Sequence, residues 1–239
     1  MSLAEKPDIR GRASKEINFT RFRVFSDRKR TNVLRESEQS LILYLVQRIP
    51  SYISSDFLSF LGGIGSLIFF LAFFIASKSN SIWLLLAIAG LVINWFGDSL
   101  DGRLAYFRNT PRKWYGFALD IVFDWFSTVA IGFGYYVYAG ADYKWLGLAF
   151  IALYGWAILI AQLRYKITDK YTIDSGVVGP TELRVIIALI IIAEVAFNGA
   201  IHYAAMLIAL ALFLLNFKDT LCLLEAGNRR DDEERQLLR

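Results

Sequence analysis

Residues 97–124 read GDSLDGRLAYFRNTPRKWYGFALDIVFD and place four aspartates where two apolar blocks of the chain meet. Asp98 and Asp101 lie three residues apart at the end of one block, and Asp120 and Asp124 lie four apart near the start of the next. Spacings of three and four put each pair on one face of a helix. A short basic loop joins the blocks, so we predict two antiparallel helices whose aspartates meet at the same depth.

Apolar blocks on both sides of this stretch are long enough to cross a membrane. A helix needs about 20 apolar residues to span a hydrocarbon core of roughly 30 Å. The blocks cover residues 57–77, 81–97, 114–140, 145–163 and 185–217, and the pair Asn198-Gly199 offers a turn within the last one. The sequence therefore predicts an all-α polytopic membrane protein with six transmembrane helices.

Basic residues predict the orientation of these spans. Of the 26 Lys and Arg residues, 24 lie in the N-terminal arm, the loops after the second and fourth spans, and the C-terminal tail. Because basic segments stay in the cytoplasm, we expect both termini and the aspartates on that side of a bacterial-type inner membrane. Residues 1–48 contain no apolar core of a signal peptide, so we expect none.

Three regions are expected along the chain: a basic arm (1–50), a six-helix transmembrane domain (51–218) and a charged cytoplasmic tail (219–239). Within the arm, we predict a helix over residues 27–46 that either lies on the anionic inner leaflet or is a solvated segment that sets topology. The first alternative rests on an irregular apolar stripe formed by Val33, Leu34, Leu41, Leu45 and Val46.

Acidic side chains inside a span cost at least about 2.5 kcal/mol each, and therefore usually face a cavity and mark function. Four of them close together need a counter-charge. Hard divalent cations with oxygen ligands supply it, and two such ions can support a phosphoryl displacement. A single His and a single Cys exclude a paired-His or Cys-rich metal site.

Two further observations bear on this interpretation. Gly97, Gly102 and Gly116 flank the carboxylates and would permit close approach by a ligand. The competing interpretation is a set of structural aspartates at helix ends that pair with the nearby arginines, which are Arg103, Arg108 and Arg112.

The pattern Asp98-x2-Asp101-Gly102-x2-Ala105, followed by Gly116-x3-Asp120-x3-Asp124, resembles the signature D-x2-D-G-x2-A-R-x8-G-x3-D-x3-D of the CDP-alcohol phosphotransferases. Six spans, an N-terminal amphipathic helix and the pair Ile49-Pro50 before the first span also match that family, over residues 27–217. The resemblance implies that the four aspartates bind two divalent ions, Mg²⁺ or Mn²⁺, and that Asp124 is also the general base. It further implies that Gly102, Ala105 and Gly116 hold the cytidine diphosphate.

Three departures from the family pattern are visible. Tyr106 occupies the position of the signature Arg, which leaves Arg108 as the candidate replacement in the nucleotide site. The spacer before Gly116 is one residue longer than usual, and Ser54-Ser55-Asp56 stands where Thr-Pro-Asn is common.

The loop before the fifth span is the other polar element. Lys166, Lys170 and Arg184 are candidate contacts for a substrate phosphate, with a purely topogenic loop as the alternative. We predict that Thr181, which follows Gly179-Pro180, caps the fifth helix.

The resemblance implies a phospholipid-biosynthesis enzyme that transfers a substituted phosphate from a CDP-linked donor to an alcohol and releases CMP. CDP-diacylglycerol is the favoured donor, and CDP-choline or CDP-ethanolamine with a lipid alcohol acceptor is the alternative. A Mg²⁺-dependent intramembrane prenyltransferase and a cation transporter are more remote. Besides these substrates we expect membrane lipids as partners and no nucleic acid, and the family resemblance allows a homodimer.

Two predictions concern residues outside this site. We expect Glu194 to be a buried hydrogen-bonding residue near the opposite end of its span. We expect Gly62, Gly63 and Gly65 to serve close helix packing rather than nucleotide binding.

Overall fold

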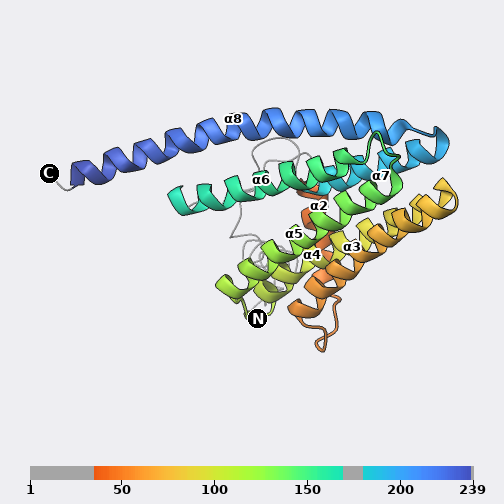
Figure 1. Cartoon of the computed structure of the whole chain (residues 1–239). Helices are drawn as coiled ribbons and strands as arrows, with labels where there is room; N and C mark the ends of the chain where they lie inside the picture. The colour runs from red at the N-terminus through yellow and green to blue at the C-terminus, as the bar shows by residue number, and fades with distance from the viewer. Residues whose placement is uncertain (1–34, 169–179, 238–239) are drawn as a thin grey trace, which may run out of the picture.

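The computed structural model describes residues 35–168 and 180–237, and every regular element within them is a helix (Figure 1). The elements are α2 (Arg35–Val46), α3 (Ser55–Lys78), the short 3₁₀ helix η1 (Ser81–Leu84), α4 (Leu85–Phe107), α5 (Lys113–Tyr138), α6 (Trp145–Thr168), α7 (Pro180–Ala196) and α8 (Ala200–Leu237). The predicted all-α fold is confirmed over the described residues.

Within the described residues, five stretches are long and apolar enough to cross a membrane, as expected of an integral membrane protein. They are Ser55–Lys78, Ser81–Phe107, Lys113–Tyr138, Trp145–Thr168 and Ala200–Leu237. Helix α7 is apolar too, but its 17 residues make a rod of only about 26 Å. Since the hydrocarbon core measures roughly 30 Å, the sixth predicted span stays a prediction.

Helices α3 and α4 pack with their backbones in contact along a row of glycines. A Cβ atom on Gly97 would lie 2.4 Å from both the Gly62 nitrogen and the Leu58 oxygen. A Cβ atom on Gly65 would lie 2.4 Å from the Asn94 nitrogen. The close-packing role predicted for Gly62 and Gly65 is confirmed. The prediction that Gly97 admits a ligand is wrong, because the backbone of α3 fills that space.

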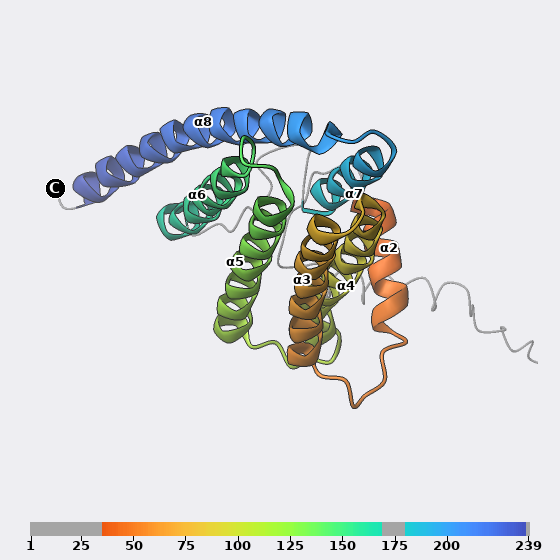
Figure 2. The same ribbon diagram turned by 45° about the vertical axis from the view of Figure 1, so that its right-hand side comes forward.

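Helix α2 packs against the rest of the bundle, and Figure 2 shows it beside α4. A buried cluster of Ile42, Val46, Leu58, Leu100 and Leu104 joins α2 to α3 and α4. Leu41, on another side of α2, is 46% exposed, so the predicted stripe does not form one face. Val33 and Leu34 lie outside the described residues. The buried face therefore holds α2 directly to the transmembrane helices.

The turn between α7 and α8 is built around Glu194, whose side chain is 2% exposed. Its Oε2 atom accepts from the backbone N–H groups of Gly199 and Ile201, both at 2.9 Å. Its Oε1 atom accepts from the Tyr138 hydroxyl at 2.8 Å. Gly199 has φ 95°, a conformation that favours glycine. The turn predicted at Asn198-Gly199 and the buried Glu194 are both confirmed.

Helix α8 continues without interruption across the predicted domain boundary at residue 218 and extends beyond the other helices (Figure 1). Its Arg230 side chain donates to the carbonyls of Lys166 and Ile167, at 2.9 and 2.7 Å, and so binds the last turn of α6. Positive charge suits the C-terminal end of a helix. Arg230 thus attaches the tail to the C-terminal end of α6.

Candidate active site

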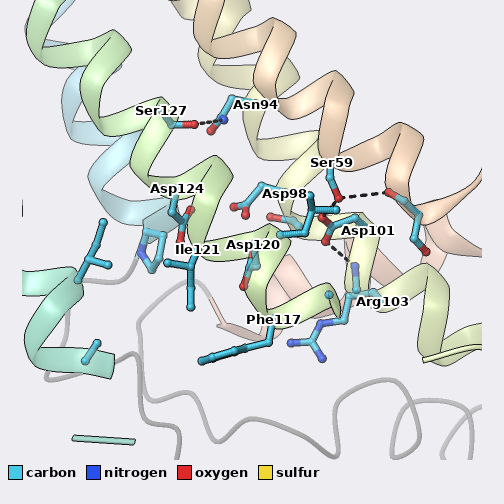
Figure 3. Close-up of a pocket in the computed structure, with 18 of the residues that line it drawn as sticks. Ser59, Asn94, Asp98, Asp101, Arg103, Phe117, Asp120, Ile121, Asp124 and Ser127 are labelled. Carbon is cyan, nitrogen blue, oxygen red and sulfur yellow. Dashed lines mark hydrogen bonds between the residues drawn. The ribbon is translucent and has the colours of Figure 1, made fainter. Parts of the chain in front are cut away.

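Asp98, Asp120 and Asp124 converge between α4 and α5, and Figure 3 shows their carboxylates pointing toward one another. Each offers one carboxylate oxygen, and these oxygens all lie within 4.8 Å of one another. Asp98 comes from near the end of α4, whereas the other two come from the first half of α5. The prediction that the two pairs of aspartates meet at one depth is therefore confirmed for these three residues.

Asp101 lies next to the trio but is bound differently. Its Oδ2 atom accepts from the Ser59 hydroxyl of α3 at 2.5 Å, and its Oδ1 atom accepts from the Gly102 backbone N–H. The side chain lines the same cavity as the other three aspartates. Ser59 thus orients the fourth carboxylate from a helix that the sequence pattern did not connect with it.

The donor set of this cluster suits a hard divalent cation. Carboxylate oxygens are the ligands that Mg²⁺ and Mn²⁺ prefer, and the three oxygens are close enough to share one ion. Asp98, Asp120 and Asp124, with Asp101 beside them, are the residues that would hold metal.

Arg184 brings a positive charge into the cluster from the start of α7. Its Nη2 atom donates to Asp98 Oδ2 at 2.7 Å, and its Nε atom donates to Asn94 Oδ1 at 3.0 Å. Of the candidate structural partners, Arg112 pairs with Asp56 and not with the trio. The ion pair of Asp98 therefore comes from α7, from a residue expected to contact substrate phosphate.

Asn94 is a site residue that the sequence reasoning missed. It is 7% exposed and lies one helical turn before Asp98. Its Nδ2 atom donates to the hydroxyls of Ser66 at 3.0 Å and Ser127 at 3.1 Å, and the second bond is drawn in Figure 3. A lone amide inside an apolar span was the available signal, because such a group needs partners. Asn94 links α3, α5 and α7 behind the carboxylates.

A cavity of about 1160 Å³ opens over the aspartates and is lined by Gly102, Ala105, Arg108 and Gly116, among others. A Cβ atom added to Gly102 or Gly116 would meet nothing within 4 Å. The candidate nucleotide residues therefore all line the cavity, and Gly102 and Gly116 leave open room beside the backbone.

Arg108 also lines the cavity, but its guanidinium group bonds to the segment before α3. It donates to the carbonyl oxygens of Ile53, Pro50 (2.8 Å) and Ile49 (3.3 Å). In the same segment Ser54 caps α3 by accepting from the Phe57 backbone N–H at 3.1 Å. Arg108 thus fixes the chain that borders the cavity.

The basic residues proposed for substrate phosphate are divided by the structure. Arg184 lines the cavity, Lys166 lies in the last turn of α6, and Lys170 falls outside the described residues.

The predicted N-cap role of Thr181 is wrong, because α7 already begins at Pro180. The Thr181 hydroxyl instead donates to Glu38 Oε1 at 2.7 Å. Proline suits the first helical position, which explains the earlier start.

Comparison with known proteins bears directly on this site. A search of curated proteins found no match to the chain. The sequence model of one family, CDP-alcohol phosphatidyltransferase, matches residues 52–215. This stretch is more than half of the 239 residues and contains all four aspartates, Gly102, Gly116 and Arg184. The chain therefore belongs to the CDP-alcohol phosphatidyltransferase family, whose members are transferases of substituted phosphate groups.

Proposed function

We propose that this transferase moves a phosphatidyl group from CDP-diacylglycerol to the hydroxyl of a small alcohol and releases CMP. One observation carries the proposal: three carboxylates from two helices meet beneath a cavity of about 1160 Å³. Phosphoryl transfer depends on positioned charge around the phosphate more than on covalent chemistry with the protein. The arrangement offers acidic ligands for a metal ion and open room for a nucleotide beside Gly102 and Gly116.

In this proposal Asp98, Asp101, Asp120 and Asp124 hold two divalent ions, Mg²⁺ or Mn²⁺. Bound ions of this kind supply polarisation of the phosphate and offset the charge that develops on it. Gly102, Ala105 and Gly116 accommodate the cytidine diphosphate, and Arg108 supports the adjacent segment before α3. Arg184, Lys166 and Lys170 are the proposed contacts for a substrate phosphate.

Asp124 is the proposed general base. An alcohol is a weak nucleophile, so a carboxylate within hydrogen-bond reach must take its proton as the new bond forms. The acceptor oxygen then bonds to the phosphorus of the donor, and the bond from that phosphorus to the CMP oxygen breaks. CMP leaves with the electron pair, and the proton stays on the Asp124 carboxylate.

The cavity also has apolar walls that fit a lipid. Its lining includes Phe150 and Ile158 of α6, Ile187 of α7, and Leu212 and Leu215 of α8. Both donor classes of the family use one lipid substrate, so these walls favour a lipid without choosing the donor. We favour CDP-diacylglycerol because the six predicted spans resemble the members of the family that use this donor.

The proposed setting is a bacterial-type inner membrane with the aspartates on the cytoplasmic side. The support is the distribution of 24 of the 26 basic residues over the termini and two loops. Pairing as a homodimer stays a prediction from the family resemblance.

The test measures CMP release by purified protein in lipid nanodiscs with Mg²⁺. CDP-diacylglycerol is supplied with inositol phosphate, glycerol phosphate or serine, and CDP-choline or CDP-ethanolamine is supplied with diacylglycerol. We expect release with the first donor, and a decrease of roughly 10²- to 10⁴-fold in Asp124→Asn. Asp142→Asn is the matched control, because Asp142 is exposed in the turn between α5 and α6.

Three results would change the proposal. Absence of CMP with every combination, or full turnover by Asp124→Asn, contradicts it. Release only with CDP-choline or CDP-ethanolamine assigns the enzyme to the other donor class.

A further inference from the structure

Glu38 is a buried carboxylate on α2 that bonds to two other helices. The residue is 5% exposed. Its Oε1 atom accepts from the Thr181 hydroxyl of α7 at 2.7 Å and from Trp95 Nε1 of α4 at 3.4 Å. A buried carboxylate is costly unless hydrogen bonds compensate it. Simple packing of α2 against the bundle does not require one at this position.

Both partners of Glu38 stand one helical turn from a residue of the active site. Trp95 precedes Asp98 by three positions on α4, and Thr181 precedes Arg184 by three positions on α7. Residues three apart share a helix face. The same two helices are joined directly by the Arg184–Asp98 ion pair of 2.7 Å. Helix α4 is therefore connected with α7 in two ways: indirectly through Glu38, and directly through the bonds of Arg184 to Asp98 and Asn94.

The helix that carries Glu38 is itself held in place by buried apolar contacts. Ile42 and Val46, one and two turns further along α2, are 0% and 1% exposed. They pack with Leu58 of α3 and Leu100 of α4. Since these contacts fix α2 on the bundle, the Glu38 carboxylate is a fixed point for the first turn of α7.

We propose that Glu38 is a positioning residue for the transfer reaction, an inference that rests on the proposed function. It holds the first turn of α7 so that the Arg184 guanidinium meets Asp98 at the metal cluster. Glu38 acts through Thr181 and Arg184. The juxtamembrane helix α2 thereby becomes part of the active-site architecture.

Five single variants and one double variant test this role in the CMP-release assay. Glu38→Ala and Thr181→Val remove either end of the bond, whereas Glu38→Gln and Thr181→Ser keep an acceptor or a hydroxyl. Glu36→Ala is the matched control, because Glu36 is exposed on the same helix.

We expect Glu38→Ala and Thr181→Val each to lower kcat about 10-fold, as loss of a supporting hydrogen bond does at other metal sites. The donor KM should change little, because the proposed nucleotide residues Gly102, Ala105 and Gly116 are untouched. Glu38→Gln and Thr181→Ser should restore most of the turnover. The double variant Glu38→Ala/Thr181→Val should be no slower than Glu38→Ala alone, because Glu38→Ala already removes the bond that Thr181→Val removes.

The outcomes separate this proposal from the proposed function. If the wild type releases no CMP, the proposed function fails, and the role of Glu38 in that transfer fails with it. If the wild type turns over while Glu38→Ala matches Glu36→Ala, or the two losses add in the double variant, only the positioning role is overturned.

Hydrogen exchange gives a second readout that does not need turnover. Loss of the bond should speed amide exchange over residues 181–188 of α7 in Glu38→Ala and Thr181→Val, relative to Glu36→Ala. Unchanged exchange there overturns the tether between α2 and α7.

Discussion

The Arg184 guanidinium bridges two residues one turn apart on α4, with Nη2 at 2.7 Å from Asp98 Oδ2 and Nε at 3.0 Å from Asn94 Oδ1. A planar group with donors in fixed directions can satisfy both acceptors at once. The contact sets the first turn of α7 against the end of α4, where the carboxylates gather. It also supplies positive charge to a cluster of like charges, which would otherwise repel one another.

Replacement of Arg184 by Lys should therefore impair transfer although the charge is kept. One ammonium group cannot reproduce both bonds, and a hydrogen bond to a charged group contributes on the order of 1.5–3 kcal/mol, so kcat/KM should fall roughly 10- to 100-fold. The measurement is CMP release as a function of Mg²⁺ concentration. Arg235→Lys is the control, because Arg235 is exposed in the helical tail. Wild-type kcat/KM in Arg184→Lys contradicts the bridging role.

Metal removal should stop the reaction reversibly. EDTA should abolish CMP release, and Mg²⁺ or Mn²⁺ should restore it, because three carboxylate oxygens within 4.8 Å suit a hard cation. Asp120→Asn should weaken Mn²⁺ binding measured by electron paramagnetic resonance, whereas Asp142→Asn should not. Full activity in EDTA would remove the metal from the proposal.

The cluster of aspartates could be predicted from the sequence because its members are close to one another along the chain. Intervals of three and four residues place each pair on one helix face. The short loop between the two helices then brings Asp98 and Asp124 to the same depth. The all-α fold was equally accessible, since long apolar blocks require helices in a membrane.

The supporting residues could not be found in this way, because they depend on which helices pack together. Ser59 of α3 reaches Asp101, and Glu38 of α2 reaches Thr181, 143 positions away. No local pattern relates such distant positions. Gly97 shows the same limit, since its position beside Asp98 suggested a ligand while packing places α3 against it.

Arg108 should act by holding the segment before α3. Arg108→Ala removes a cation bonded to the carbonyls of Ile49, Pro50 and Ile53. We expect a stability loss on the order of 1–3 kcal/mol, measured as a lower thermal unfolding midpoint in detergent, together with a higher donor KM. A higher KM at an unchanged midpoint would instead assign Arg108 a direct contact with the donor phosphate.

Glu194 should matter for stability and not for chemistry. Glu194→Ala leaves the backbone N–H groups of Gly199 and Ile201 and the Tyr138 hydroxyl without this acceptor. The expected cost is on the order of 1–3 kcal/mol, seen as a lower unfolding midpoint, with Glu194→Gln intermediate. The donor KM and Mg²⁺ dependence of the folded fraction should stay at wild-type values. A shift in either would connect this end of the bundle with the active site.

A methyl group at two glycines five residues apart on α4 should have opposite consequences. At Gly97 the new Cβ would lie 2.4 Å from backbone atoms of Leu58 and Gly62, which a rotamer change cannot relieve. Gly97→Ala should therefore separate α3 from α4 and give little folded protein by size-exclusion chromatography. At Gly102 nothing lies within 4 Å, so Gly102→Ala should fold with an unfolding midpoint close to that of the wild type.

The Gly102→Ala variant also tests where the nucleotide lies. If the cytidine diphosphate occupies the open side of Gly102, the alanine methyl takes part of its room and the donor KM should rise about 10-fold. A methylene-sized change in a binding pocket typically changes discrimination between substrates by about 10- to 200-fold. We expect the open position at Gly102 to lie at the low end of this range. A normal donor KM in well-folded Gly102→Ala would move the nucleotide away from this face of α4, because an occupied face cannot accept the added methyl without loss.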